Sequence, residues 1–66
     1  MPKKVYEVID ALESHGWVVV RQRGSHRQFK HPTSPAVITV AGKLSKTVPV
    51  GLLANIRRRS GIEELR

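Results

Sequence analysis

Apolar residues recur at helical spacing in the first part of the chain. They occupy positions i, i+3, i+4 and i+7, with polar residues on the opposite side, at Val5, Val8, Ile9 and Leu12. Such a stripe predicts an amphipathic helix, which we place over residues 3–15. Gly16 is expected to end it, because glycine readily takes the left-handed conformation that follows a last helical turn.

The pattern then changes to one typical of β-strands. Residues 17–23 are rich in β-branched and aromatic side chains and too few for a typical helix, so they predict a first strand. Gly24 marks a turn, and residues 25–31 form a second run of alternating character. The two prolines of residues 32–35 predict a loop, and residues 37–40 predict a third strand. We therefore expect a three-stranded antiparallel meander.

The alternation in the second run assigns its side chains to two faces of the sheet. Phe29 is the large apolar residue of this run, so its face, which also carries Arg27, should be the core face. The opposite, solvent-facing side then carries His26, Gln28 and Lys30. Lys30 lies roughly 13 Å from His26 along the strand, at about 3.3 Å per residue.

A second amphipathic pattern follows the strands. Its apolar positions are Val48, Leu52, Leu53 and Ile56. Ser45 and Thr47 are candidates for its N-terminal cap, Arg57–Arg59 fall in its last turn, and Gly61 should end it. The order helix, three strands, helix predicts a single α+β domain over residues 1–66. Two helices on one face of the sheet would bury both apolar stripes and leave the other face open.

The charge distribution narrows the class of partner. Twelve Lys and Arg residues against five Asp and Glu residues give a formal charge of +7. Residues 14–62 contain nine of those cations and no carboxylate. A long basic block without acids is typical of a protein that binds a polyanion, since each neutralised phosphate releases condensed counterions. Docking to an acidic protein is the alternative interpretation.

Other bulk features limit location and chemistry. The chain has no cysteine, which excludes disulfides and thiolate-bound zinc and fits a reducing cytoplasm. No apolar run approaches the roughly 20 residues that span a bilayer, and no signal-type segment is present at the N-terminus. We expect a cytoplasmic protein without a membrane segment, a metal site or a cofactor.

The motifs in this order resemble the HicA toxin family, also known as YcfA-like. The similarity covers nearly the whole chain and rests on Gly16-Trp17, Arg23-Gly24-Ser25-His26, Gln28-Phe29-Lys30-His31-Pro32, and Gly51, Leu53 and Ile56 before Gly61. Gly-Ser-His alone is a weak signal, but its place between two strands and before His-Pro is specific. The chain departs from many family members at Ala41-Gly42, Leu52 and Arg57, which bears on substrate preference and antitoxin fit.

The resemblance implies a fold, an activity and a partner. The implied fold is like the double-stranded-RNA-binding domain, with the order α-β-β-β-α. The implied function is the toxin of a type II toxin–antitoxin system, an mRNA interferase that a HicB-type antitoxin neutralises. The resemblance also implies that His26 is the catalytic residue of a metal-independent endoribonuclease.

Histidine at this position suits RNA cleavage. When the ribose 2′-hydroxyl attacks the neighbouring phosphate, a general base must take its proton near neutral pH, where imidazole is well matched to the task. The residues that we expect to contact RNA around His26 are Arg23, Gly24, Ser25, Gln28, Lys30, Lys43 and Lys46. Gly24 permits close approach of the RNA backbone, and Ser25 offers a hydroxyl to a phosphate or to the ring.

Other conspicuous residues have simpler interpretations. His31 falls on the opposite face from His26 by strand parity, so we expect a structural role at the strand end. His15 is expected on the surface, at a helix end whose dipole favours it. Trp17 is expected in the core. The run Arg57–Arg59 is either a solvated helix end or a phosphate clamp.

Two other functions remain open at this point. A non-catalytic RNA-binding module would use the same basic face, with His26 as one polar contact. A small DNA-binding or protein-interaction domain is the weakest alternative, because Pro49 and Gly51 interrupt the start of the second helix and make it a poor recognition helix.

Overall fold

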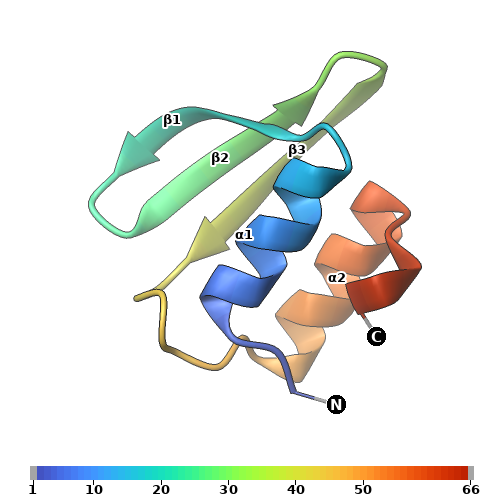
Figure 1. Cartoon of the computed structure of the whole chain (residues 1–66). Coiled ribbons are helices and arrows are strands. Elements are labelled where there is room, and N and C mark those ends of the chain that lie inside the picture. The colour runs from blue at the N-terminus through green and yellow to red at the C-terminus, as the bar shows by residue number, and fades with distance from the viewer. Residues whose placement is uncertain (1, 66) are drawn as a thin grey trace.

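The elements follow the order α-β-β-β-α, and a short 3₁₀ helix comes after them (Figure 1). The structure is a computed structural model that describes residues 2–65. Its elements are α1 (Val5–Ser14), β1 (Val18–Arg23), β2 (His26–His31), β3 (Ser34–Ala41), α2 (Val50–Ser60) and η1 (Glu63–Leu65). The α+β class and the element order predicted from the sequence are confirmed.

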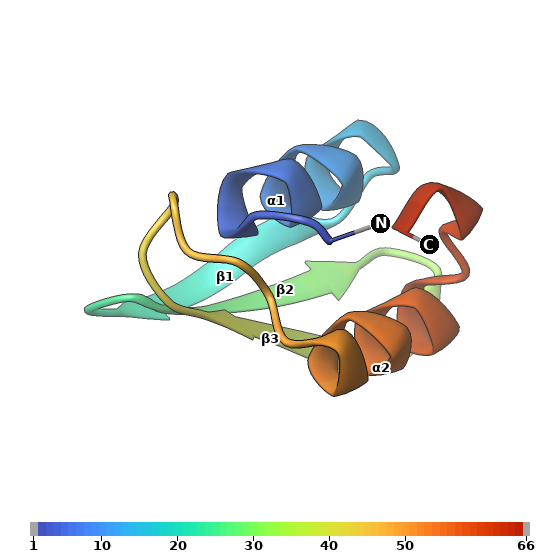
Figure 2. The same cartoon turned by 90° about the horizontal axis from the view of Figure 1, so that it is seen from below.

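The three strands form one antiparallel sheet in the order β1-β2-β3. Both helices lie on the same side of this sheet (Figures 1 and 2). The core between sheet and helices is one cluster of buried residues: Val5, Val8, Leu12, Trp17, Phe29, Ile38, Val40, Val48, Leu53, Ile56, Ile62 and Leu65. Trp17 is 4% exposed and Phe29 1%, so the prediction that both belong to the core is confirmed.

β3 begins earlier than predicted. Residues 32–35 were expected to form a loop before a strand over 37–40, but the strand already starts at Ser34, which pairs with His31 across a two-residue turn. Pro35 is tolerated because β3 is an edge strand, and a proline without an N–H is harmless where no neighbour needs that donor. The register shifts beyond Lys30, where the additional β3 residues are accommodated.

α1 begins later than predicted, at Val5 instead of Lys3. Lys4 forms an isolated antiparallel bridge with Thr47, and the Val48 N–H donates to the Lys3 carbonyl at 2.8 Å. The first helical N–H groups also find partners in this segment, since Val5 donates to the Lys46 carbonyl at 2.9 Å. Residues 3–4 therefore serve as a short strand that ties the start of α1 to the loop after β3.

α2 lacks the predicted side-chain cap. Its N-cap residue is Pro49, with no side-chain capping bond, so the expectation for Ser45 or Thr47 is wrong. Thr47 is occupied instead in the bridge with Lys4. The helix terminates as predicted, with Gly61 left-handed at φ 72° and its N–H donating to the Arg57 carbonyl.

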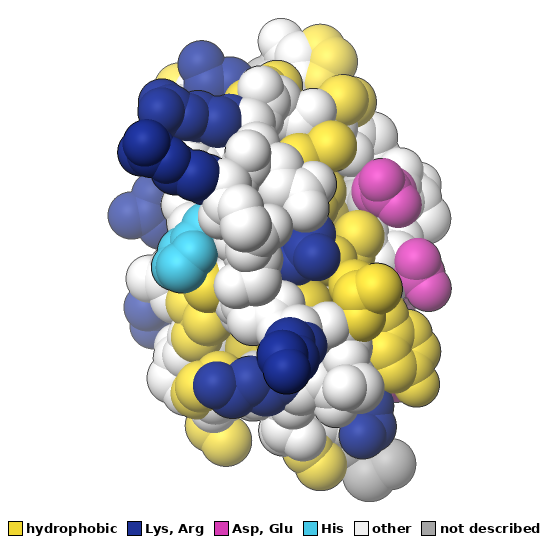
Figure 3. All heavy atoms as spheres, turned by 90° about the vertical axis from the view of Figure 1, so that its left-hand side faces the viewer, with side chains coloured by type: hydrophobic (Ala, Val, Ile, Leu, Met, Phe, Trp, Pro, Cys, Tyr) yellow, Lys and Arg dark blue, Asp and Glu magenta, His cyan; other side chains and the backbone are white. Residues whose placement is uncertain are grey.

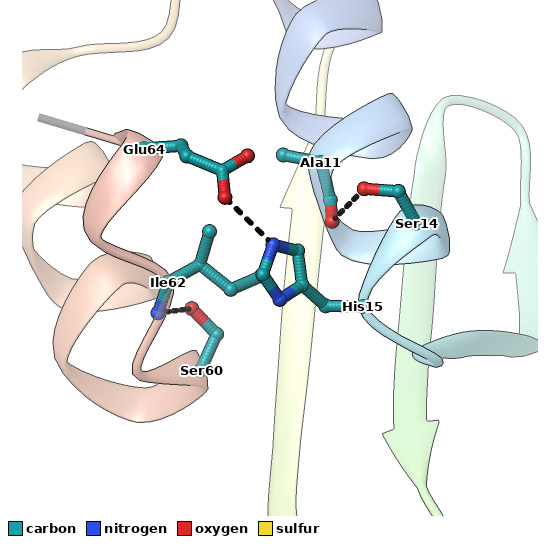
Figure 4. Close-up of polar contacts among 6 residues, drawn as sticks. All are labelled: Ala11, Ser14, His15, Ser60, Ile62 and Glu64. Atoms are coloured by element: carbon teal, nitrogen blue, oxygen red, sulfur yellow. Dashed lines mark hydrogen bonds and ion pairs between the residues drawn. The ribbon is translucent and has the colours of Figure 1, made fainter.

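The segment after α2 folds back on the end of α1 (Figure 4). The Ile62 N–H donates to Ser60 Oγ at 3.2 Å, and His15 Nε2 contacts Glu64 Oε1 at 3.0 Å. The His15 and Glu64 side chains remain well exposed, and pairs of this kind contribute little. Burial of Ile62 and Leu65 at 1% exposure is therefore the main force that holds this segment.

Gly16 gives a test of this packing. Its φ is +90°, and a Cβ there would lie 3.0 Å from His31 Nε2. Gly61, at φ +72°, has no atom within 4 Å of such a Cβ. Left-handed strain alone costs roughly 1–2 kcal/mol, so Gly61→Ala should lose about that much. Gly16→Ala should lose clearly more in urea denaturation, because His31 must also move. Equal losses would contradict the contact.

Candidate functional site

His26 is the first residue of β2 and is exposed on the sheet face that the helices leave open. It follows a two-residue turn, Gly24-Ser25, that joins the paired residues Arg23 and His26. Gly24 has φ +58°, which suits the first central position of a type II′ hairpin turn. Figure 3 shows a histidine side chain beside a group of lysine and arginine side chains, with acidic side chains on the other side of the view.

A cationic hollow of about 200 Å³ lies beside His26. It is lined by Arg21, Arg23, His26, Gln28 and Thr39, which come from all three strands. Cross-strand pairing explains this grouping, because Arg23 lies opposite His26, and Gln28 lies between Arg21 and Thr39. No carboxylate lines the hollow, so its electrostatic character favours an anion.

A β-bulge places both arginines on the open face. Val19 pairs with Phe29 and Arg21 with Gln28, so Val20 is an extra residue in β1. With strict alternation from Val19, Arg21 and Arg23 would share the covered face of Phe29. The bulge reverses the parity and turns them toward His26. Sequence reasoning missed Arg21, because a bulge leaves no signal in the alternation of this valine-rich strand.

A second hollow, of about 350 Å³, flanks His26 on its other side. It is lined by Ser25, His26, Ala41, Gly42, Lys46, Thr47, Pro49 and Leu52. Arg27 holds one wall together, since its Nη1 donates to the carbonyls of Ser25 at 3.2 Å and Gly42 at 3.3 Å. The Gly42 N–H also donates to Ser25 O. Arg27 therefore ties the residue before His26 to the loop after β3.

The structure gathers most of the predicted contact residues around these two hollows. Arg23 and Gln28 line the cationic hollow, and Ser25 and Lys46 line the second one. Gly24 lies in the hairpin turn between the strands. Lys30 and Lys43 line neither hollow: Lys30 is exposed farther along the same face, and Lys43 is exposed in the loop after β3.

The ring of His26 has no polar partner among the described residues. Within residues 2–65, no group forms a hydrogen bond or an ion pair with it. An imidazole in this state is accessible to a ligand from either hollow. It also lacks the orienting partner that fixes the histidine in catalytic triads, so a bound substrate would have to supply that orientation.

In contrast to His26, both ring nitrogens of His31 have hydrogen-bond partners. Its Nε2 donates to the His15 carbonyl at 3.0 Å, and its Nδ1 accepts from the Thr33 N–H at 3.2 Å. With these partners Nε2 is the donor and Nδ1 the acceptor. The ring also packs against Trp17, with centroids 5.3 Å apart. Nε2 thus holds β2 to the end of α1, and Nδ1 holds the turn between β2 and β3, in agreement with the structural role expected for His31.

The arginines at the end of α2 lie in a different region. Arg59 lines a hollow of about 170 Å³ with His15, Trp17 and His31. These residues lie at the opposite end of β2 from His26. The described residues contain no group of three or more His, Cys, Asp or Glu side chains that could hold a metal ion. None of the helices formed by residues 2–65 is long and apolar enough to cross a membrane.

These features define a small basic α+β protein with an exposed histidine on a cationic, open sheet face. The family described as the HicA toxin of bacterial toxin-antitoxin matches residues 5–62. The chain therefore belongs to the HicA toxin family, and it is the toxin member of a toxin–antitoxin pair. The sequence has no significant match among curated proteins.

The two histidines of β2 should respond differently to substitution. His31→Ala removes three hydrogen bonds, to His15 and to the N–H and hydroxyl of Thr33, and a ring contact, so we expect a loss of about 1–2 kcal/mol in the free energy of unfolding. His26→Ala removes no hydrogen bond or ion pair among the described residues and should stay within about 0.5 kcal/mol of the wild type. Urea denaturation measures both. A larger loss for His26→Ala would show that its ring supports the fold.

Proposed function

We propose that this toxin is a metal-independent endoribonuclease that cleaves mRNA with His26 as its catalytic residue. The observation that carries the proposal is the position of His26, exposed between a cationic hollow and a second hollow, neither of which is lined by a carboxylate. Membership of the HicA toxin family supports a toxic activity of this kind. The antitoxin partner is proposed to be of the HicB type and to cover this face.

The proposed reaction needs one proton acceptor at the site. The His26 imidazole takes the proton of a ribose 2′-hydroxyl, and the 2′-oxygen forms a bond to the adjacent phosphorus. The bond from phosphorus to the 5′-oxygen of the next nucleotide breaks, and that oxygen takes a proton from water. The products are a 2′,3′-cyclic phosphate and a 5′-hydroxyl. Attacking group and leaving group both belong to the RNA, so the protein supplies a base and charge neutralisation.

The neighbouring side chains are assigned to RNA binding. Arg21 and Arg23 lie beside His26 in the cationic hollow and neutralise the phosphates nearest to the reaction, and Gln28 adds polar groups there. Lys30, farther along the face, contacts a more distant phosphate. Around the other hollow, Lys46 and Ser25 contact the RNA backbone, Lys43 extends this region, and Gly24 lets the backbone approach closely.

One observation favours a second candidate function, an RNA-binding module without catalysis. The His26 ring has no hydrogen-bond partner among the described residues, whereas catalytic histidines are commonly oriented by a neighbour. A module of this kind would use the same basic face and would inhibit translation by occupying mRNA. Cleavage assays on substituted proteins separate the two functions.

Substitution of His26 tests the catalytic role. His26→Ala should lower the rate of RNA cleavage by roughly 10²- to 10⁴-fold, the usual contribution of a general acid or base. RNA affinity should change little, because the arginines of the cationic hollow remain. The assay follows cleavage of a transcript by purified protein in EDTA, where the wild-type rate should be unaffected.

His15→Ala is the matched control, since it removes an exposed histidine at the far end of β2 from the two hollows beside His26. It should cleave like the wild type. RNA binding without cleavage by any of the three proteins would establish the module instead. Loss of wild-type cleavage in EDTA would contradict the metal-independent reaction.

The salt dependence of RNA binding tests the cationic hollow. Each phosphate contact to a single strand contributes about 0.7 to the slope of log affinity against log salt concentration. Arg21→Ala and Arg23→Ala should each reduce the slope by about that amount. Arg59→Ala, at the other end of the strands, should leave it unchanged. Equal slopes for all four proteins would remove the two arginines from the RNA contact.

A further inference from the structure

The hollow between β2, β3 and α2 differs in lining from the cationic hollow. Its volume of about 350 Å³ falls within the roughly 300–1,000 Å³ of pockets that hold small organic groups. Ala41, Pro49 and Leu52 supply apolar surface, while Thr47 and Lys46 are polar and exposed. The site therefore offers an apolar surface with hydrogen-bonding groups beside it.

The walls of this hollow are held by backbone contacts on several sides. Arg27 and the Gly42 N–H fix the Ser25 carbonyl. The Lys46 N–H donates to Lys43 O at 2.9 Å, and Lys46 O accepts from the start of α1. Because these contacts exist without a ligand, binding here needs little additional ordering of the chain, which favours affinity.

His26 belongs to both hollows, so an extended ligand that occupies the two must pass over its ring. The arginines of the cationic hollow match phosphate groups. The second hollow matches a flat group with apolar faces and a polar edge. A nucleobase has this chemistry, and in single-stranded RNA the bases are free to splay away from their neighbours into such sites.

We propose that the hollow beside Leu52 binds one unstacked nucleobase of single-stranded RNA, next to the phosphate that lies over His26. This inference rests on the proposed RNA-binding function and adds a base-binding subsite to it. Duplex RNA does not satisfy the site, because its bases are stacked and paired and cannot enter a hollow of this kind.

Three RNA probes of equal backbone length test the subsite. They are a ten-nucleotide 2′-O-methyl RNA of mixed sequence, which lacks the attacking hydroxyl, the same backbone without bases, and the RNA in duplex form. The wild type should bind the single strand roughly five- to tenfold more tightly than the backbone without bases. Per phosphate, the duplex should bind no more tightly than the backbone without bases. Equal affinity for the first two probes would overturn the proposal.

Substitutions that fill the hollow provide a second test of the subsite. Leu52→Trp should abolish the advantage of the base-bearing probe and leave both the affinity for the backbone without bases and the salt slope unchanged. Val50→Trp adds the same ring at a neighbouring position that is 80% exposed and does not line the hollow, so it should behave like the wild type. If Leu52→Trp is unfolded, Thr47→Trp fills the hollow from an exposed wall position. A retained advantage in a folded filled variant would refute the subsite.

These outcomes separate the subsite from the nuclease function. Cleavage of unmodified RNA by a protein that shows no base dependence would keep the nuclease and reject the subsite. Base-dependent binding without any cleavage would keep the subsite and reject the nuclease. Tight binding of the duplex alone would identify a surface that reads helix shape, and that result also rejects the subsite.

Discussion

Phe29 lies near the middle of the central strand, 1% exposed against the helices. Because side chains of a strand alternate between faces, burial of this one ring sends His26, Gln28 and Lys30 to the other face. Phe29 pairs directly with Val19 and Ile38, and because paired residues share a face, its burial also fixes which side chains of β1 and β3 face the helices. A one-residue slip of β2 would bury His26 and expose Phe29, so the hydrophobic core and the candidate site depend on a single register.

The features that follow from periodicity were predictable from the sequence. The stripe of α1, the alternation around Phe29 and the termination at Gly61 each depend on local residues, and each is present in the structure. Features that depend on partners distant in sequence were not predictable in this way. Proline at position 35 suggested a loop, and only the edge position of β3 makes it compatible with a strand. Thr47 has the chemistry of a helix cap, but pairing with Lys4 gives it another role.

The candidate site also combines residues that were predictable from the sequence with features that were not. His26 and Gln28 follow from parity within one strand, whereas Arg21 reaches the site only because Val20 is bulged. The second hollow was not foreseen, since it combines the start of β2, the end of β3 and the first turn of α2. Ser25, His26 and Lys46 were each selected from the sequence as site residues, but nothing in the sequence indicated that they line one hollow. Short elements thus reveal single functional residues, while the shape around them is a product of tertiary packing.

The described carboxylates all lie on α1 and η1, on the helix side of the molecule, whereas Arg21, Arg23 and Lys30 lie on the open sheet face. Lys3, Lys4 and Arg57–Arg59 offset the acids on the helical side, so the uncompensated positive charge lies toward the sheet side. In the field of a polyanion such a molecule experiences a torque before any contact forms, and this torque turns the sheet toward the charged chain. The positions of acidic and basic residues along the sequence therefore influence how the protein is oriented as it diffuses toward a polyanion, as well as how strongly it is attracted at contact.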